Sequence, residues 1–137
     1  MNLPPNTVIS VRDVVDVERA RRGARDFTHH LGFDRFDTEK VVLAVSELAT
    51  NLARYATSGE IDLRTIHGQQ RLGIHVESRD QGPGIVDVAA AARGGSSRNG
   101  GLGSGLAGVR RLMDDFELTS GPSGTTVICR KWRKTAA

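Results

Sequence analysis

The sequence has little cysteine and no long apolar run, and these absences exclude several classes of protein. Cys129 is the single cysteine, so no disulfide can form within the chain, in agreement with a reducing cytoplasm. No apolar stretch approaches the length that crosses a bilayer. The first five residues lack the basic and apolar regions of a signal peptide. We therefore expect a cytoplasmic protein without a membrane partner.

The sequence also lacks an excess of one charge. Nineteen Lys and Arg residues face sixteen Asp and Glu residues, the net charge is +3, and the two signs are mixed along the chain. Only Arg130–Lys134 forms a basic run, and a nucleic-acid footprint should line one face of a domain. We interpret this run as a solvated tail and expect no nucleic-acid partner.

The length and composition are typical of one soluble globular domain. The chain has 137 residues, of which 38% are hydrophobic and 26% charged, and it contains no internal repeat or dividing linker. We expect residues 1–137 to form a single domain with a core over about 8–132.

The hydrophobic pattern predicts helices that cluster apart from strands. The expected helices are 14–31, capped by Asp13 and ended by Gly32; 38–55, capped by Asp37; 87–92; and 106–114. The expected strands are 8–11, 61–66, 71–78, 116–119 and 125–131, and the second and third form a hairpin. This order predicts an α/β (α+β) two-layer sandwich, a mixed, mostly antiparallel sheet covered on one face by helices.

One face of the second predicted helix changes from apolar to polar along its length. Leu43, Glu47, Asn51 and Arg54 follow one another at spacings of four, four and three residues. A buried site entered from one end would have this pattern. An exposed helix with an incidental Glu–Asn pair remains the alternative, because such pairs are common on solvated faces.

A second group of polar and small residues follows the third predicted strand, at Asp80–Ile85. Asp80 alternates in register with the apolar residues of that strand, so a regular strand would place its carboxylate on the apolar face. A buried carboxylate needs a hydrogen-bond donor, which a ligand amino group could supply. Gly82 and Gly84 allow a tight turn and close approach to a flat ligand. An ordinary turn after a strand is the alternative.

A glycine-rich segment, Gly94–Gly105, precedes the third long helix. Free backbone N–H groups at the junction between a glycine-rich loop and a helix form a phosphate site, to which Arg98 could add positive charge. A flexible loop is the alternative, although it fits poorly with the abrupt start of a strong helix.

Together the three groups resemble the GHKL ATPase superfamily, and the likeness extends over about 8–132. Three stretches carry it: residues 46–56, 80–85 and 100–117. Within the superfamily the chain is most similar to small serine/threonine kinases that act as anti-sigma factors and partner switches, especially the switch kinases of the stressosome. The fold implied is the ATP-binding, or Bergerat, fold of that superfamily.

The resemblance implies a role for each group. Glu47 would be the general base, Asn51 would hold Mg²⁺ bridging the ATP phosphates, and Asp80 would accept a hydrogen bond from the adenine amino group. The remaining nucleotide-binding residues that it implies are Arg54, Gly82, Gly84, Ile85, Arg98, Gly100, Gly101, Leu102, Gly103, Ser104 and Gly105. Some relatives carry an Arg just before the Gly-x-Gly of the lid, where this chain has Asn99, and Arg98 is therefore a candidate phosphate contact.

The function that follows is an ATP-dependent kinase that phosphorylates a STAS-domain regulator. A PP2C-type phosphatase or a sigma factor would be a further partner, and the oligomeric state stays open. The catalytic part of a histidine kinase is disfavoured because the chain has no room for a dimerising phosphoacceptor hairpin. An ATP-sensing binding module without turnover is the second alternative.

Overall fold

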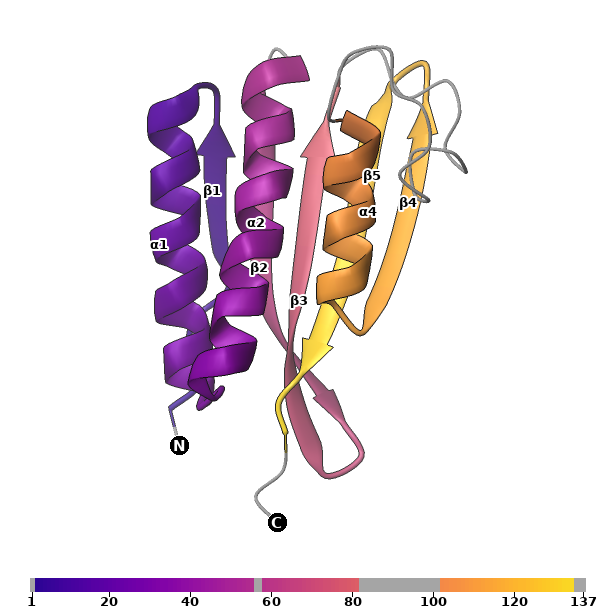
Figure 1. The fold of residues 1–137 in the computed structure, drawn as a ribbon. Coiled ribbons are helices and arrows are strands. Elements are labelled where there is room, and N and C mark those ends of the chain that lie inside the picture. Colours follow the sequence, from indigo (N-terminus) through magenta and orange to yellow (C-terminus); the bar gives the residue numbers. More distant parts are fainter. Residues whose placement is uncertain (1, 56–57, 82–101, 135–137) are drawn as a thin grey trace.

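Three helices pack on one face of a five-stranded sheet in the computed structural model, which describes residues 2–55, 58–81 and 102–134 (Figure 1). The elements are β1 (Thr7–Val11), α1 (Val14–Leu31), α2 (Arg35–Tyr55), β2 (Gly59–Gly68), β3 (Arg71–Asp80), α4 (Leu102–Leu112), β4 (Asp115–Gly121) and β5 (Gly124–Trp132). The strand order is β1-β2-β3-β5-β4. Every pairing between described strands is antiparallel, so the parallel member expected of a mixed sheet is not found among them.

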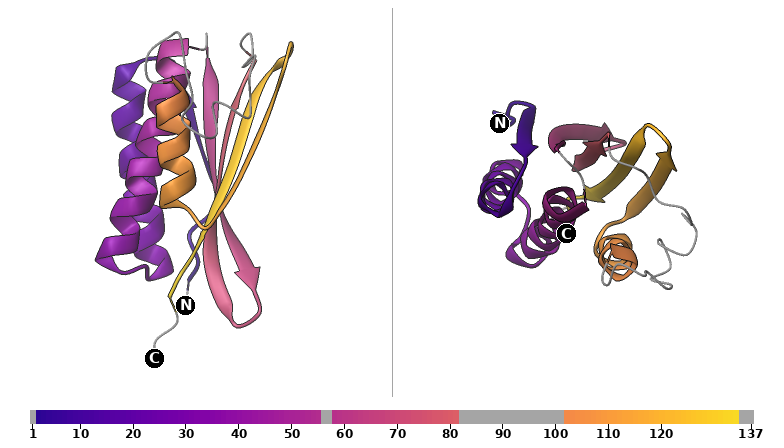
Figure 2. Two further views of the ribbon diagram at one scale, coloured as in Figure 1. Left: turned by 45° about the vertical axis from the view of Figure 1, so that its right-hand side comes forward. Right: turned by 90° about the horizontal axis from the view of Figure 1, so that it is seen from above.

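The two layers are separated as the hydrophobic pattern predicts. Figure 2 shows all three helices on the same side of the sheet, with the opposite face uncovered by the helices of the described ranges. The core lies between the layers, where α2 contributes a continuous apolar face. Its buried residues there are Val41, Val42, Ala44, Val45, Leu48, Ala49 and Leu52. Cys129 on β5 is fully buried in this core, and its burial raises the pKa of the thiol to about 12.

The helix ends agree with the sequence patterns in one helix and differ in the other. Asp13 caps α1 by accepting hydrogen bonds from the backbone N–H groups of Val15 and Asp16, and Gly32 ends it with φ 81°. In α2 the capping side chain is Asp34, whose Oδ1 accepts from Asp37 N at 2.7 Å. The predicted cap, Asp37, is wrong, because α2 begins at Arg35 and Asp37 already lies in its first turn. No described helix is long and apolar enough to cross a bilayer.

The central hairpin is longer than the alternating pattern predicts. The β2–β3 ladder runs without a break from Gly59↔Asp80 to Gly68↔Arg71, so the turn comprises only residues 69–70. Gln70, the second residue of this turn, has φ 58°, in the left-handed region. Backbone pairing continues through polar residues, and the side-chain pattern therefore does not mark the strand ends.

The C-terminal basic run is not a solvated tail over most of its length. Arg130 to Trp132 belong to β5, and Lys131 is only 7% exposed. Lys131 Nζ donates a hydrogen bond to the carbonyl oxygen of Leu112 at 3.0 Å. The lysine thus caps the C-terminal end of α4, where a cation stabilises the unpaired carbonyls.

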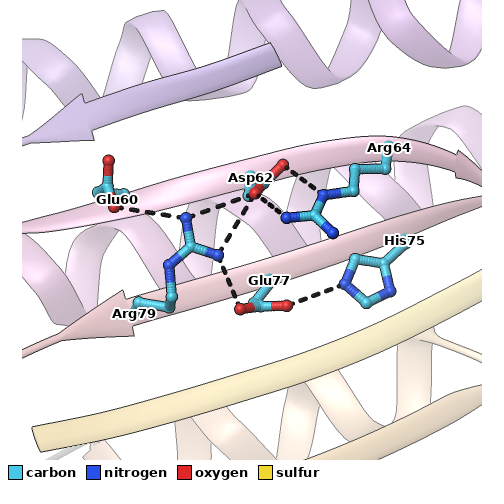
Figure 3. A network of polar contacts seen from close by, with 6 residues as sticks. All are labelled: Glu60, Asp62, Arg64, His75, Glu77 and Arg79. Atoms are coloured by element: carbon cyan, nitrogen blue, oxygen red, sulfur yellow. Dashed lines mark hydrogen bonds and ion pairs between the residues drawn. The ribbon is translucent and has the colours of Figure 1, made fainter. Parts of the chain in front are cut away.

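The uncovered face of the sheet carries a network of charged side chains on β2 and β3 (Figure 3). Asp62, whose side chain is 4% exposed, pairs with Arg64 at 2.8 Å and with Arg79 at 3.3 Å. Glu77 accepts from Arg79 at 2.7 Å and lies 3.1 Å from the ring of His75. The hydrogen bond from Arg64, followed by the one from Arg79, holds the pKa of Asp62 below its ordinary value. Burial would raise the pKa of Glu77, but the bonds from Arg79 and His75 outweigh it and lower that pKa as well.

Candidate functional site

The polar stripe of α2 lines a cavity of about 400 Å³ against α4. The lining residues are Leu43, Glu47, Thr50, Asn51 and Arg54 from α2, and Gly105, Gly108 and Leu112 from α4. The apolar-to-polar stripe predicted from the sequence is therefore one wall of a real cavity. The exposed-helix alternative does not account for the facing wall that α4 provides.

The first turn of α4 lies directly against the two polar residues that the sequence singles out. A Cβ atom at Gly105 would be 2.9 Å from Glu47 Oε2 and 3.8 Å from both amide atoms of Asn51. Any side chain at Gly105 would displace the carboxylate, so this glycine allows the close approach of the two helices.

Helix α4 begins earlier than the sequence suggests, so the last residues of the glycine-rich segment are helical. Residues Leu102 to Gly105 form the first turn of α4, whereas the expected helix begins at residue 106. The first four N–H groups of a helix have no partner within it and carry partial positive charge. The N-terminal end of α4, beside Glu47 and Asn51, is therefore the kind of helix terminus that can bind phosphate.

Asn51 supplies an independent sign that this wall binds a ligand. Its Nδ2 atom is buried and has no hydrogen-bond partner within the described residues. Leaving a buried polar group unpaired costs about 1–3 kcal/mol. A carboxamide can direct either its oxygen or its nitrogen into the cavity. One amide oxygen beside a carboxylate and helix N–H groups is a donor set that fits a magnesium–nucleotide complex, in which the metal keeps waters and phosphate oxygens.

Asp80 lies at the end of β3, on the strand face that the sequence predicts. The β3–β5 register is regular up to Asp80↔Thr125, and Ile74, Val76 and Ser78 on the same face are buried. Thr125 N donates a hydrogen bond to Asp80 Oδ1 at 3.3 Å. The carboxylate thus has one donor from the protein, and a donor from a ligand amino group stays a prediction.

The position of Asp80 depends on the start of β5. Gly124 has φ 141°, and a Cβ atom there would be 2.0 Å from the carbonyl oxygen of Asp80. Only glycine fits such an approach without displacing the end of β3. Thr125 was not singled out by sequence reasoning, because its place opposite Asp80 depends on strand register.

The described residues do not join Asp80 and Glu47 into one cavity. Asp80 lines a second hollow of about 420 Å³, together with Gly59, Arg79 and Thr126 among others. The C-terminal ends of α2 and β3 and the start of α4 nevertheless lie at the same end of the molecule (Figure 1). Several predicted nucleotide-binding residues lie outside the described ranges, namely Gly82, Gly84, Ile85, Arg98, Gly100 and Gly101, as do the predicted short helix at 87–92 and the rest of the lid before Leu102.

Three cavity residues were missed by sequence reasoning although a helical signal exists for them. Thr50 lies three residues after Glu47, while Gly108 and Leu112 follow Gly105 at spacings of three and four. Helical periodicity places each on the same face as its neighbour. What the sequence does not show is that these two faces meet.

Comparison with known proteins agrees with this geometry. Residues 11–131 match the histidine kinase-like ATPase domain. The chain belongs to the histidine kinase-like ATPase family. Membership confirms the expected GHKL-type fold and the use of a nucleotide, and it spans both helix walls and Asp80.

A curated relative defines the class of enzyme within the family. The serine/threonine-protein kinase RsbT of Bacillus subtilis (strain 168) is 40% identical over 118 residues, which cover 85% of this chain and 89% of RsbT. This relationship confirms the resemblance to the switch kinases. It places the chain among the serine/threonine-protein kinases.

Several solved structures share the fold at low sequence identity. The RsbU and RsbW domains of Rv1364c from Mycobacterium tuberculosis align with a TM-score of 0.70 at 17% identity, covering 97% of this chain and 34% of that one. The SiaB–SiaC complex from Pseudomonas aeruginosa aligns with a TM-score of 0.55 at 11% identity, and the alignment covers 92% of this chain and 89% of that one. The mycobacterial sensor histidine kinase MprB aligns with a TM-score of 0.56 at 16% identity, covering 96% and 100%.

Proposed function

We propose that this kinase transfers the γ-phosphoryl group of ATP to a Ser or Thr hydroxyl of a STAS-domain regulator, and acts by partner switching in a stress or sigma-factor pathway. The observation that carries the proposal is the cavity in which Glu47 lies beside the unpaired amide of Asn51 and the first turn of α4. Its relationship to RsbT supports a protein hydroxyl as the acceptor.

In this proposal each residue of the cavity has a separate role in phosphoryl transfer. Asn51 would hold Mg²⁺, and the backbone N–H groups of residues 102–105 would bind phosphate oxygens. Glu47 accepts the proton of the substrate hydroxyl as its oxygen attacks. Mg²⁺, when bound, supplies positive charge that offsets the charge of the transferred group. Arg54 adds a cation at the mouth of the cavity, while Asp80 orients the adenine through its amino group.

The product of the reaction favours separation of the two proteins. A new phosphate places about −1.5 to −2 charges on the partner, beside Glu47, which regains its negative charge when it releases the accepted proton to solvent. Repulsion at this short range weakens the complex, and a shift of about 1.4 kcal/mol already lowers affinity tenfold. The freed kinase can then engage a second partner, a PP2C-type phosphatase or a sigma factor.

The test is transfer of labelled γ-phosphate to each STAS-domain protein of the source organism. Glu47→Gln should lower the transfer rate by about 10² to 10⁴, the usual contribution of a general base, and leave ADP affinity within about twofold. Asn51→Ala should lower both the transfer rate and the affinity for ADP. The matched control is Glu39→Gln, because Glu39 lies on the same helix in an exposed ion pair with Arg25.

Two results would change the proposal. Transfer by Glu47→Gln at the wild-type rate contradicts the role of Glu47. Binding of ADP by the wild type without transfer to any STAS protein would favour an ATP-sensing module that works by binding alone.

A further inference from the structure

The cavity between α2 and α4 has an apolar end that nucleotide and metal do not explain. Leu43 is 49% exposed although it is a large apolar side chain one turn from Glu47. Gly108 and Leu112 face it from α4. Phosphate, metal and base groups all belong to the polar end at Glu47, Asn51 and the first turn of α4. The apolar end is therefore available to another molecule.

Gly108 indicates that this end of the cavity is kept open. It lies inside α4 and has no positive φ, so the backbone does not require glycine. Among the described residues, no atom outside the backbone of its own helix and its chain neighbours lies within 4 Å of the position that its Cβ would take, whereas the same position at Gly105 is in contact with Glu47. Glycine inside a helix is less stable than alanine. Within the described chain nothing compensates for this loss, and space beside α4 is the property that Gly108 provides.

The apolar end continues along α2 away from the cavity. Phe36, Leu43 and Glu47 follow one another at spacings of seven and four, which places them along one line of the helix. Phe36 is 73% exposed, and the ammonium group of Lys40 lies 5.6 Å from its ring centroid. An apolar strip thus extends the wall of the cavity by two turns.

We propose that Leu43, Gly108 and Leu112 form a specificity subsite for the protein substrate, which receives an apolar side chain next to the phosphorylated Ser or Thr. This inference rests on the proposed function. A water molecule or a small polar acceptor would gain nothing from the exposed Leu43, whereas a protein segment that brings its hydroxyl to Glu47 must pass over it.

The geometry of the helix gives the spacing between the two groups. Residues four apart on α2 are separated by about 6 Å along the axis. Successive residues of an extended segment advance by about 3.3 Å. The apolar residue therefore lies one or two positions from the hydroxyl-bearing residue of the substrate.

The experiment changes the subsite without touching Glu47 or Asn51. Leu43→Ser removes the apolar contact, and Gly108→Leu fills the open space with a good helix former. The matched control is Val14→Ser, which makes a similar change at an apolar residue that is 76% exposed at the start of α1. Affinity for the STAS protein that wild type phosphorylates is measured by calorimetry in the presence of ADP, together with KM and kcat for transfer.

Both subsite variants should raise KM and Kd for the STAS protein by about tenfold to a hundredfold, the value of one buried apolar side chain. Affinity for ADP and kcat should stay within about twofold, and Val14→Ser should behave as wild type. Unchanged KM and Kd in both folded variants overturn the subsite. If wild type binds a STAS protein without transfer, the kinase proposal fails while Kd still tests the subsite; if it binds none, both fail.

Discussion

At the scale of single residues, the buried amide nitrogen of Asn51 lacks, within the described part of the chain, a hydrogen-bond partner that a bound ligand could supply. Its Nδ2 atom is buried without a partner in the described residues, next to the first turn of α4. The core residues around it on α2, such as Leu48 and Leu52, are ordinary apolar side chains. An apolar residue would satisfy this position in the free protein at least as well. The proposed role of Asn51 in holding a magnesium–nucleotide complex would account for the amide.

Replacement of Asn51 by leucine, which branches at the same carbon but carries no polar atom, should change stability and nucleotide binding in opposite directions. We expect the free energy of unfolding to rise by up to about 1 kcal/mol without ligand, because an unpaired buried amide disappears. ADP affinity in the presence of Mg²⁺ should fall by at least tenfold. Urea unfolding with and without ADP measures both quantities. A clear loss of stability without ligand would show that the amide is already satisfied.

At the scale of elements, α4 is fixed at its far end and contributes its first turn to the cavity. Asp114 N donates to Arg130 O at 2.9 Å, and Trp132 N donates to Asp114 Oδ2 at 2.8 Å, just after the helix ends. Lys131 caps the last turn through Leu112 O. These bonds attach α4 to β5, and the β4–β5 hairpin therefore sets where the first turn lies relative to Glu47.

The start of β5 should have a comparable influence on Asp80. Gly124→Ala should cost at least about 2 kcal/mol, because a Cβ at φ 141° would overlap the carbonyl oxygen of Asp80. ADP affinity should fall as well, since the carboxylate moves with its backbone. The control is Gly121→Ala on the other side of the same turn, where no atom of the described residues, chain neighbours apart, lies within 4 Å of the Cβ position. Thermal unfolding and ADP titration compare the two, and equal behaviour would contradict the role of Gly124.

At the scale of the whole molecule, the sheet separates two chemically different faces. The covered face contains the apolar core and the cavity, whereas the uncovered face carries the ion-pair network of Figure 3. Arg79 connects Glu60, Asp62 and Glu77 across two strands. On that face the partly buried charges are paired with one another, by side chains of β2 and β3.

This network should make the stability of the protein depend on pH in the acid range. The pKa values of Asp62 and Glu77 are lowered on folding from ordinary values of 3.8 and 4.5, so the unfolded chain binds protons first as pH falls. Their contribution is complete above about pH 5 and is lost progressively below it, as pH falls through the lowered values. Asp62→Asn should cost about 1–3 kcal/mol at pH 7 and flatten the acid decline.

Urea unfolding between pH 7 and pH 3.5 measures this dependence. Asp26→Asn, a change at an exposed residue of α1 outside the network, serves as the control. A decline as steep in Asp62→Asn as in the control would show that other carboxylates cause it.

The sequence by itself determined the features that depend on neighbours in the chain. The amphipathic face of α1, its cap at Asp13 and the alignment of Leu43, Glu47, Asn51 and Arg54 on α2 all follow from helical periodicity. The alternation of β3 likewise placed Asp80 on the covered face. Local geometry repeats every few residues, so a short window of sequence contains it.

Tertiary structure decided the features in which distant segments compete. Either Asp34 or Asp37 could cap α2, and the approach of Gly105 to Glu47 depends on how α4 docks. Lys131, in a run that reads as a polar tail, is buried because β5 pairs with two strands and the end of α4 needs a cation. The position of Gly108 opposite Leu43 also depends on how α4 docks against α2. Gly105 and Glu47 lie 58 positions apart in the chain, and Lys131 and Leu112 lie 19 apart. The energies of such contacts depend on packing and register that no local pattern specifies.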